Sequence, residues 1–219
     1  MSNIKILVEG PTEILFVNEV LKPNFFEREI YIKPFLFQKA GGVPKYSISQ
    51  KQILNTIKSD RSCFCTTMVD FYGLPRDWSG KKESQSCQNY QDKAQMVEQA
   101  LLEDIVAKMG KSWNTAQFIP YVQMHEFEAL LFSDTSILAG SNKSVSAQLN
   151  NVLKSFSCPE EINDNYNTCP SRRIKEHIEN YVKTVDGIIA THKIGLEKMR
   201  RECPHFNEWI TKLEDIGNQ

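Results

Sequence analysis

The hydrophobic residues of the first half of the chain fall into two alternating patterns. Short runs rich in β-branched residues predict strands at residues 4–8, 30–37, 63–69 and 118–122. Apolar residues spaced three and four apart predict helices at residues 14–21, 46–57, 93–109 and 125–132. This alternation is typical of an α/β fold with a mostly parallel sheet flanked by helices.

The second half of the chain has a largely helical pattern. It predicts helices at residues 144–155, 171–183, 186–198 and 206–213. A polar segment at residues 76–91 is predicted to be an exposed loop. Because 219 residues are somewhat few for two independent domains, we expect an α/β core at residues 1–135 and a helical extension at residues 136–219 packed on it.

Composition narrows the class of protein. With 41% hydrophobic and 24% charged residues, the chain is typical of a soluble globular protein. No apolar run approaches the roughly 20 residues of a bilayer-spanning helix, and no cleavable leader is recognisable at the N-terminus. We therefore expect a cytoplasmic protein with no membrane partner.

Cysteine, histidine and net charge exclude several functions. The six cysteines show no tight disulfide framework and are expected to be reduced thiols. Zinc is not expected, because the chain has no CxxC pair and its four histidines are scattered. The formal net charge of −1 gives no overall attraction to nucleic acid. Any such contact must come from local basic patches or from a partner.

Acidic residues follow two of the predicted strands. Glu9 closes the first strand, Glu13 lies one helical turn further on, and Asp70 closes the third strand. The carboxyl ends of parallel strands form the edge where ligands bind. Hard cations such as Mg²⁺ prefer carboxylate oxygens, so this edge is a candidate metal site, although acids at strand ends and in first helical turns also have ordinary structural roles.

Several motifs resemble a known family. Val8-Glu9-Gly10-Pro11-Thr12-Glu13 is similar to the first motif of the Toprim (topoisomerase–primase) domain, and Asp70 stands where that family has an Asp-x-Asp motif. Nearly the whole chain resembles a family of uncharacterised bacterial Toprim-like proteins, related to the nuclease part of overcoming-lysogenization-defect enzymes. The further motifs that carry this resemblance lie at residues 41–43, 70–75, 118–121, 125–132, 159–163 and 203–206.

The resemblance implies roles for particular residues. Glu9 would bind metal or act as general acid or base, and Asp70 would bind Mg²⁺. The second aspartate of the motif is replaced by Tyr72, so either another acid supplies the missing ligand or the site is weaker. Glu126 and Glu128 are the candidates, and we expect only one of them to reach the site, because residues two apart on a helix face different ways. His125 is a candidate to orient a carboxylate or phosphate, or a structural histidine.

Basic residues are needed because negative charge develops on the phosphoryl oxygens during cleavage. Lys39 precedes a glycine-rich loop, and Arg172 and Arg173 stand at a predicted helix start, so these three are candidate contacts to nucleic acid. Lys193, in a segment covered by the resemblance, is the candidate catalytic lysine. A solvated surface is the ordinary alternative for each of them.

The sequence thus predicts a nuclease dependent on Mg²⁺ or Mn²⁺, with Glu9, Asp70 and Lys193 as catalytic residues and Glu9, Glu13, Asp70, Glu126 and Glu128 as metal ligands. The family resemblance implies a bacterial defence system with an ATPase partner. A non-catalytic, degenerate Toprim subunit that binds an ATPase or nucleic acid is the alternative, and a small-molecule phosphatase or phosphotransferase is a third. DNA or RNA, endo- or exonucleolytic cleavage, and self-association are left open.

Overall fold

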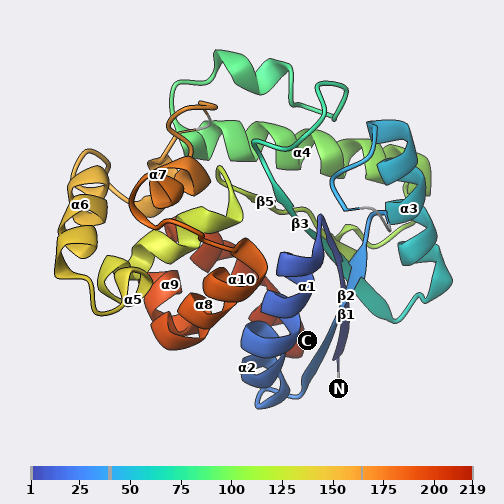
Figure 1. Cartoon of the computed structure of the whole chain (residues 1–219). Helices are drawn as coiled ribbons and strands as arrows, with labels where there is room; N and C mark the ends of the chain where they lie inside the picture. The colour runs from blue at the N-terminus through green and yellow to red at the C-terminus, as the bar shows by residue number, and fades with distance from the viewer. Residues whose placement is uncertain (1, 39–40, 164, 219) are drawn as a thin grey trace.

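Five strands form a parallel sheet at the centre of the molecule. A computed structural model describes residues 2–38, 41–163 and 165–218 (Figure 1). The strand order is β2-β1-β3-β4, and β5 also pairs with β3, all in parallel. The strands are β1 (Ser2–Val8), β2 (Ile30–Leu36), β3 (Cys63–Asp70), β4 (Phe118–Ile119) and β5 (Val122–Gln123). The predicted α/β class with a parallel sheet is confirmed.

Helices cover both faces of the sheet. On one face lie α1 (Pro11–Phe16) and α2 (Lys22–Phe26), joined by a π-helical turn, η1 (Val17–Leu21). The other face is covered by α3 (Tyr46–Ser59) and α4 (Tyr90–Met109). Side chains of a strand point alternately to its two faces. Accordingly, Ile4, Ile6 and Val8 pack against the first group, whereas Leu7 packs against the second.

The C-terminal region is helical and shares the hydrophobic core of the first face (Figure 1). Trp209 stacks on Tyr121 with ring centroids 4.3 Å apart and donates its indole N–H to Thr66 of β3 at 2.9 Å. Ser2 Oγ donates to the carbonyl of Ile216 at 3.3 Å, which holds the two ends of the chain together. The helices are α5 (Thr135–Ala139), α6 (Lys143–Leu153), α7 (Pro170–His177), α8 (Ile188–Ile194), α9 (Leu196–Glu202) and α10 (Pro204–Asp215).

Three predicted elements are interrupted. The fourth strand is two short strands separated at Pro120, because proline cannot donate a hydrogen bond to the sheet. The predicted helix 171–183 ends at His177, and Asn180 follows with a φ of 63°, a left-handed conformation typical of chain after a helix. The predicted helix 186–198 breaks at Gly195, which has a φ of 79°.

Residues 76–91 are only in part the exposed loop that their polarity predicts, because most of the segment is exposed but Trp78 is buried. Trp78 is 2% exposed and donates its indole N–H to the carbonyl of Pro44 at 3.0 Å. Its ring packs edge-on against Phe37 and Tyr46. The prediction was wrong at Trp78 because a single large apolar side chain can anchor an otherwise polar segment.

Glu160, in a 3-10 turn at Pro159–Glu161 (η5), caps the start of α10. Its fully buried carboxylate accepts the backbone N–H groups of His205 and Phe206 at 2.8 and 3.0 Å. Burial raises the pKa of Glu160 from 4.5 to about 7, against the lowering effect of His205 and these hydrogen bonds.

A raised carboxyl pKa means that the folded state binds more protons than the unfolded state between pH 4.5 and about 7. The free energy of unfolding should therefore fall as pH rises through this window, by up to about 3 kcal/mol. Urea unfolding at a series of pH values measures this slope. Glu160→Gln should flatten it, and an unchanged slope in that variant would contradict the assignment.

None of the described helices has the length and apolar composition needed to cross a bilayer. All six cysteines are free thiols, and four of them are buried.

Candidate functional site

Glu9 and Asp70 lie side by side at the carboxyl edge of the sheet. In the parallel register of β1 and β3, Val8 pairs with Met68, so Glu9 and Asp70 follow at neighbouring strand ends. The backbone N–H of Asp70 donates to Glu9 Oε2 at 3.2 Å. A Cβ atom on Gly73 would lie 3.1 Å from Glu9 Oε1, so the loop after β3 approaches Glu9 closely because it has glycine there.

Two further acids come from other segments. Glu13 stands in the first turn of α1, and Glu128 stands in a 3-10 helix, η4 (Phe127–Asp134). This helix is fastened to the strand edge, because the N–H of Phe127 donates to Asp70 Oδ1 at 2.8 Å. Only 4% of each glutamate side chain is exposed. Four carboxylates therefore converge at one edge of the sheet.

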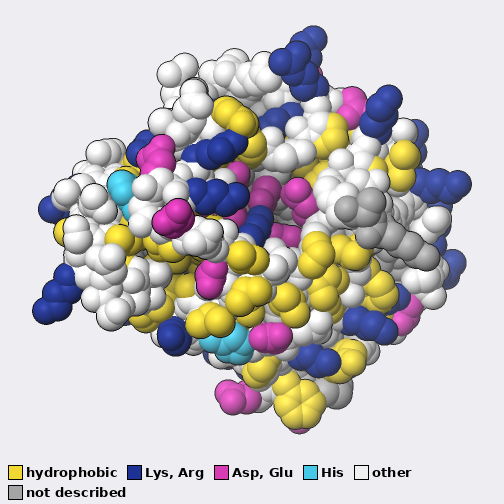
Figure 2. Space-filling view, in the orientation of Figure 1, with side chains coloured by type: hydrophobic (Ala, Val, Ile, Leu, Met, Phe, Trp, Pro, Cys, Tyr) yellow, Lys and Arg dark blue, Asp and Glu magenta, His cyan; other side chains and the backbone are white. Residues whose placement is uncertain are grey.

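One ammonium group lies between these carboxylates. Lys183 Nζ is 3.2 Å from Asp70 Oδ2, 3.3 Å from Glu13 Oε1 and 3.3 Å from Glu128 Oε2. Lys183 begins a π-helical turn, η6 (Lys183–Gly187), that leads into α8, and 32% of its side chain is exposed. Figure 2 shows acidic side chains gathered in a hollow with a basic group among them.

The charges in this cluster do not balance. Burial is the main cause that raises the pKa values of Glu9, Asp70 and Glu128, and the neighbouring acids add to it for each of them. Burial lowers the pKa of Lys183, but Asp70, Glu128 and Glu13 outweigh it and hold the value well above 10.5. Four acids with one cation leave excess negative charge, which favours the uptake of protons or of a further cation.

The cluster in its present form is an ion-paired arrangement. Among residues 2–38, 41–163 and 165–218, no three His, Cys, Asp or Glu side chains are placed to hold a metal ion. Lys183 occupies the centre instead. Glu13 Oε1 is buried and makes no hydrogen bond beyond its ion pair with Lys183. Its remaining lone pairs are available to a cation.

Glu126 lies outside the cluster. Its carboxylate accepts the N–H and the hydroxyl of Ser171 at 2.9 and 3.1 Å, and so holds the start of α7. Of the two candidate acids, Glu128 is the one that contacts Lys183. Glu126 precedes η4 with extended backbone, which explains why it points elsewhere.

Glu126→Ala should therefore affect stability and not metal affinity. Loss of the acceptor for Ser171 should lower the free energy of unfolding by about 1–2 kcal/mol. Urea unfolding measures this, and Glu126→Gln, which keeps an acceptor oxygen, is the matched control. A large loss of Mg²⁺ affinity in Glu126→Gln, measured by calorimetry, would instead place Glu126 in the metal site.

Of the predicted nucleic-acid contacts, Arg172 and Arg173 form no ion pair with the acids of the cluster. Lys39 lies outside the described residues. Arg173 donates to the carbonyl of Thr168 at 2.6 Å, and Arg172 lies over the ring of Tyr166, with 4.5 Å from its guanidinium carbon to the ring centroid.

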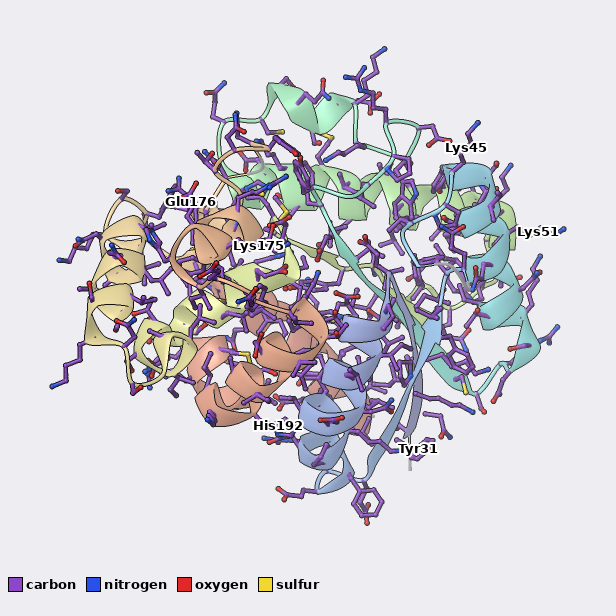
Figure 3. The ribbon with its side chains drawn as sticks, in the orientation of Figure 1. Tyr31, Lys45, Lys51, Lys175, Glu176 and His192 are labelled. Carbon is purple, nitrogen blue, oxygen red and sulfur yellow. The ribbon has the colours of Figure 1, made fainter. Side chains whose placement is uncertain are left out.

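Lys193 makes no ion pair with the clustered acids, and its catalytic role stays a prediction. It is exposed near the end of α8, about 15 Å along the helix axis from Lys183. Its neighbour His192 contacts Glu19 at 3.0 Å, low in the view of Figure 3. Lys183 was missed because it was assigned to the end of helix 171–183, and Asn180 was the available signal that this helix stops earlier.

His125 and Tyr72 lie beside the cluster. His125 is buried against Phe71, with ring centroids 5.5 Å apart. Tyr72 is 37% exposed, and its N–H donates to the carbonyl of His125 at 3.0 Å. Tyr72 contributes no carboxylate, and the acids that accompany Glu9 and Asp70 are Glu13 and Glu128.

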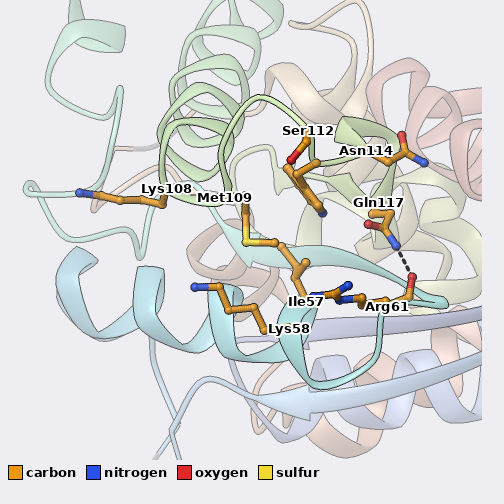
Figure 4. A pocket seen from close by; sticks show the side chains of 9 residues that line it. Ile57, Lys58, Arg61, Lys108, Met109, Ser112, Asn114 and Gln117 are labelled. Carbon is orange, nitrogen blue, oxygen red and sulfur yellow. Dashed lines mark hydrogen bonds between the residues drawn. The ribbon is translucent and has the colours of Figure 1, made fainter.

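A cavity of about 590 Å³ lies at the opposite end of β3 (Figure 4). Ile57, Arg61 and Gln117 are among its lining residues, and Gln117 Nε2 donates to the carbonyl of Arg61. A strand of eight residues spans roughly 25 Å. This cavity therefore lies apart from the acidic cluster.

The fold and the site together define a parallel α/β protein with an acidic cluster at the carboxyl edge of its sheet. The chain belongs to the family described as a domain of unknown function, DUF4276, which it matches over residues 8–214. Comparisons with curated proteins and with solved structures found no match.

Proposed function

We propose that this protein is a nuclease that hydrolyses phosphodiester bonds of DNA or RNA with the help of Mg²⁺ or Mn²⁺. The observation that carries the proposal is the convergence of Glu9, Glu13, Asp70 and Glu128 around one cationic position. Burying several carboxylates this close together destabilises the folded state unless a cation compensates their charge. Such sites are typical of enzymes rather than of stable protein cores.

The four carboxylates supply the donor atoms that a hard divalent cation prefers, and they would form its site once Lys183 no longer lies between them. Oxygen ligands of this kind are those that Mg²⁺ and Mn²⁺ prefer, and Glu13 Oε1 has no competing hydrogen bond. To admit the ion, Lys183 must withdraw towards solvent, and its partly exposed side chain allows this. When bound, the ion would polarise a phosphoryl oxygen and lower the pKa of water.

Two residues of the chain would take part in the reaction itself, one by accepting a proton and one by stabilising negative charge. Glu9, whose pKa is raised mainly by burial, is suited to accept a proton from the attacking water. Lys183, once displaced from the acids, would place positive charge beside the phosphoryl oxygens as their negative charge develops.

The Toprim resemblance supports the same chemistry, since the motif residues Glu9 and Asp70 are two of the four clustered acids. Glu13 and Glu128 would take over from the aspartate that Tyr72 replaces. The ATPase partner and the role in bacterial defence that the resemblance implies belong to this proposal.

A second candidate is favoured by one observation. Lys183 already neutralises part of the cluster through three ion pairs. A degenerate subunit that binds an ATPase or nucleic acid without cutting would be stabilised by such pairs and would need no metal.

The experiment that separates the two candidates is a cleavage assay on plasmid, linear and single-stranded substrates, with Mg²⁺, with Mn²⁺ and with EDTA. Metal-dependent cleavage that Glu9→Gln abolishes supports the nuclease. Absence of cleavage, together with no metal binding by calorimetry, supports the non-catalytic subunit.

A further inference from the structure

Two exposed tyrosines stand beside the acidic cluster. Tyr72 is 37% exposed and Tyr166 is 62% exposed. Scattered exposed apolar groups are ordinary on protein surfaces, so exposure alone decides nothing. What distinguishes this pair is how each tyrosine is connected to the segments that hold Asp70.

Tyr72 follows Asp70 by two residues, and its N–H is bonded to the carbonyl of His125 at 3.0 Å. On the other side, Glu126 binds Ser171, and the next residue, Arg172, lies over the ring of Tyr166. Phe127 links this segment back to Asp70 by a hydrogen bond of 2.8 Å. Hydrogen bonds therefore connect the segment of Tyr72 and the segment of Arg172 and Tyr166 to the edge of the acidic cluster.

The same side chains act on one another electrostatically. The pKa of the Tyr72 hydroxyl is raised, first by partial desolvation and then by charges that include Glu126 and Tyr166, whereas Arg172 lowers it. Tyr72, Tyr166 and Arg172, which these contacts connect to the edge of the acidic cluster, are together called the aromatic rim.

We propose that the aromatic rim binds the bases of single-stranded nucleic acid and so sets the substrate class of this site; the inference rests on the nuclease proposed above. Every base has a π-face that can stack on a tyrosine ring or on a guanidinium plane, and duplex bases are hidden from such contacts. Arg172 lies over the Tyr166 ring and also donates a hydrogen bond to the Tyr166 hydroxyl; a guanidinium plane can stack on a base as well.

The net charge of the chain favours binding of a single strand over binding of a duplex. Duplex binding relies on many cations along the phosphate backbone, whereas this chain has a net charge of −1. Arg173 already donates a hydrogen bond to the carbonyl of Thr168. A few bases held by stacking would give affinity with fewer phosphate contacts.

The test is binding in EDTA, where the wild-type protein cannot use a metal to cut. Fluorescence anisotropy would compare a labelled single strand of about 12 nucleotides, within the range of known single-strand sites, with the duplex of the same sequence. Tyr72→Ala and Tyr166→Ala should each weaken single-strand binding roughly 5- to 100-fold. Tyr72→Phe and Tyr166→Phe should retain it.

Tyr31→Ala is the matched control, because Tyr31 is 39% exposed at the amino end of β2, low in Figure 3, whereas the acidic cluster lies at the carboxyl edge of the sheet. It should leave binding unchanged. Equal affinity for duplex, no affinity for single strands, or full affinity in both alanine variants overturns the inference. If single strands bind through the aromatic rim but no metal supports cleavage, the proposed nuclease activity is wrong and the single-strand binding site is retained. If the protein cleaves nucleic acid and neither alanine variant changes the cleavage, the nuclease is retained and the role of the rim is wrong.

Discussion

Asp70→Asn should reduce metal-dependent cleavage by at least about 100-fold, the scale of losing one preorganised charged group in an active site. Asparagine keeps the shape of the side chain and an acceptor for the Phe127 N–H. It removes the charge that Lys183 now neutralises and that a metal ion would require. Initial cleavage rates at saturating Mg²⁺ measure the effect.

The same variant should not lose thermal stability. Burial raises the pKa of Asp70 well above 3.8, which means that the ionised carboxylate is unfavourable in the folded state, and a neutral isostere removes this cost. A melting temperature equal to or above that of the wild type, together with lost cleavage, would therefore assign Asp70 to function.

Asp134→Asn provides the opposite control. Asp134 caps α5 through Ser136 and Ile137 and pairs with Lys198. Although burial raises the pKa of Asp134, these contacts outweigh it and hold the value at about 2. Its ionised form thus stabilises the fold, so Asp134→Asn should lower the melting temperature and leave the cleavage rate unchanged. Loss of cleavage in this variant would indicate that Asp70→Asn also acts through the fold.

Lys183→Met should have two effects of opposite sign. Without metal, Glu13, Asp70 and Glu128 lose their cation. Removal of one partner of a buried pair costs about 3–5 kcal/mol, and because Lys183 is 32% exposed we expect about 1–3 kcal/mol. With the ammonium gone, Mg²⁺ should bind at least about tenfold more tightly, since two cations no longer compete for the same oxygens.

Thermal unfolding with and without Mg²⁺ measures both effects. The gain in melting temperature on adding Mg²⁺ should be larger for Lys183→Met than for the wild type. Lys193→Met is the matched control, and its gain should equal that of the wild type. If Lys193→Met changes the gain and Lys183→Met does not, the sequence-based choice of Lys193 was right and the ion-paired cluster has no part in metal binding.

Local sequence pattern was sufficient for the sheet and for three of the clustered acids, since Glu13 follows Glu9 by one helical turn. Glu9 and Asp70 end runs of β-forming residues, and parallel strands bring their carboxyl ends to one edge. The prediction needed no knowledge of contacts between distant segments.

The remaining site residues depend on such contacts. Lys183 meets Asp70 across a sequence separation of 113 residues, and its position follows from the end of α7 and the turn after it. The choice between Glu126 and Glu128 depends on where η4 begins, since Glu126 precedes its first turn. A shift of one or two residues in a predicted helix boundary reverses that choice.

The central claim is that the four carboxylates bind a metal ion in place of Lys183. The most direct test is a crystal structure of the protein soaked with Mn²⁺, with anomalous scattering used to locate the ion. We predict an anomalous peak among Glu9, Glu13, Asp70 and Glu128, with the Lys183 ammonium withdrawn towards solvent. A structure at saturating Mn²⁺ with no peak there and with Lys183 still paired to Asp70 would contradict the account.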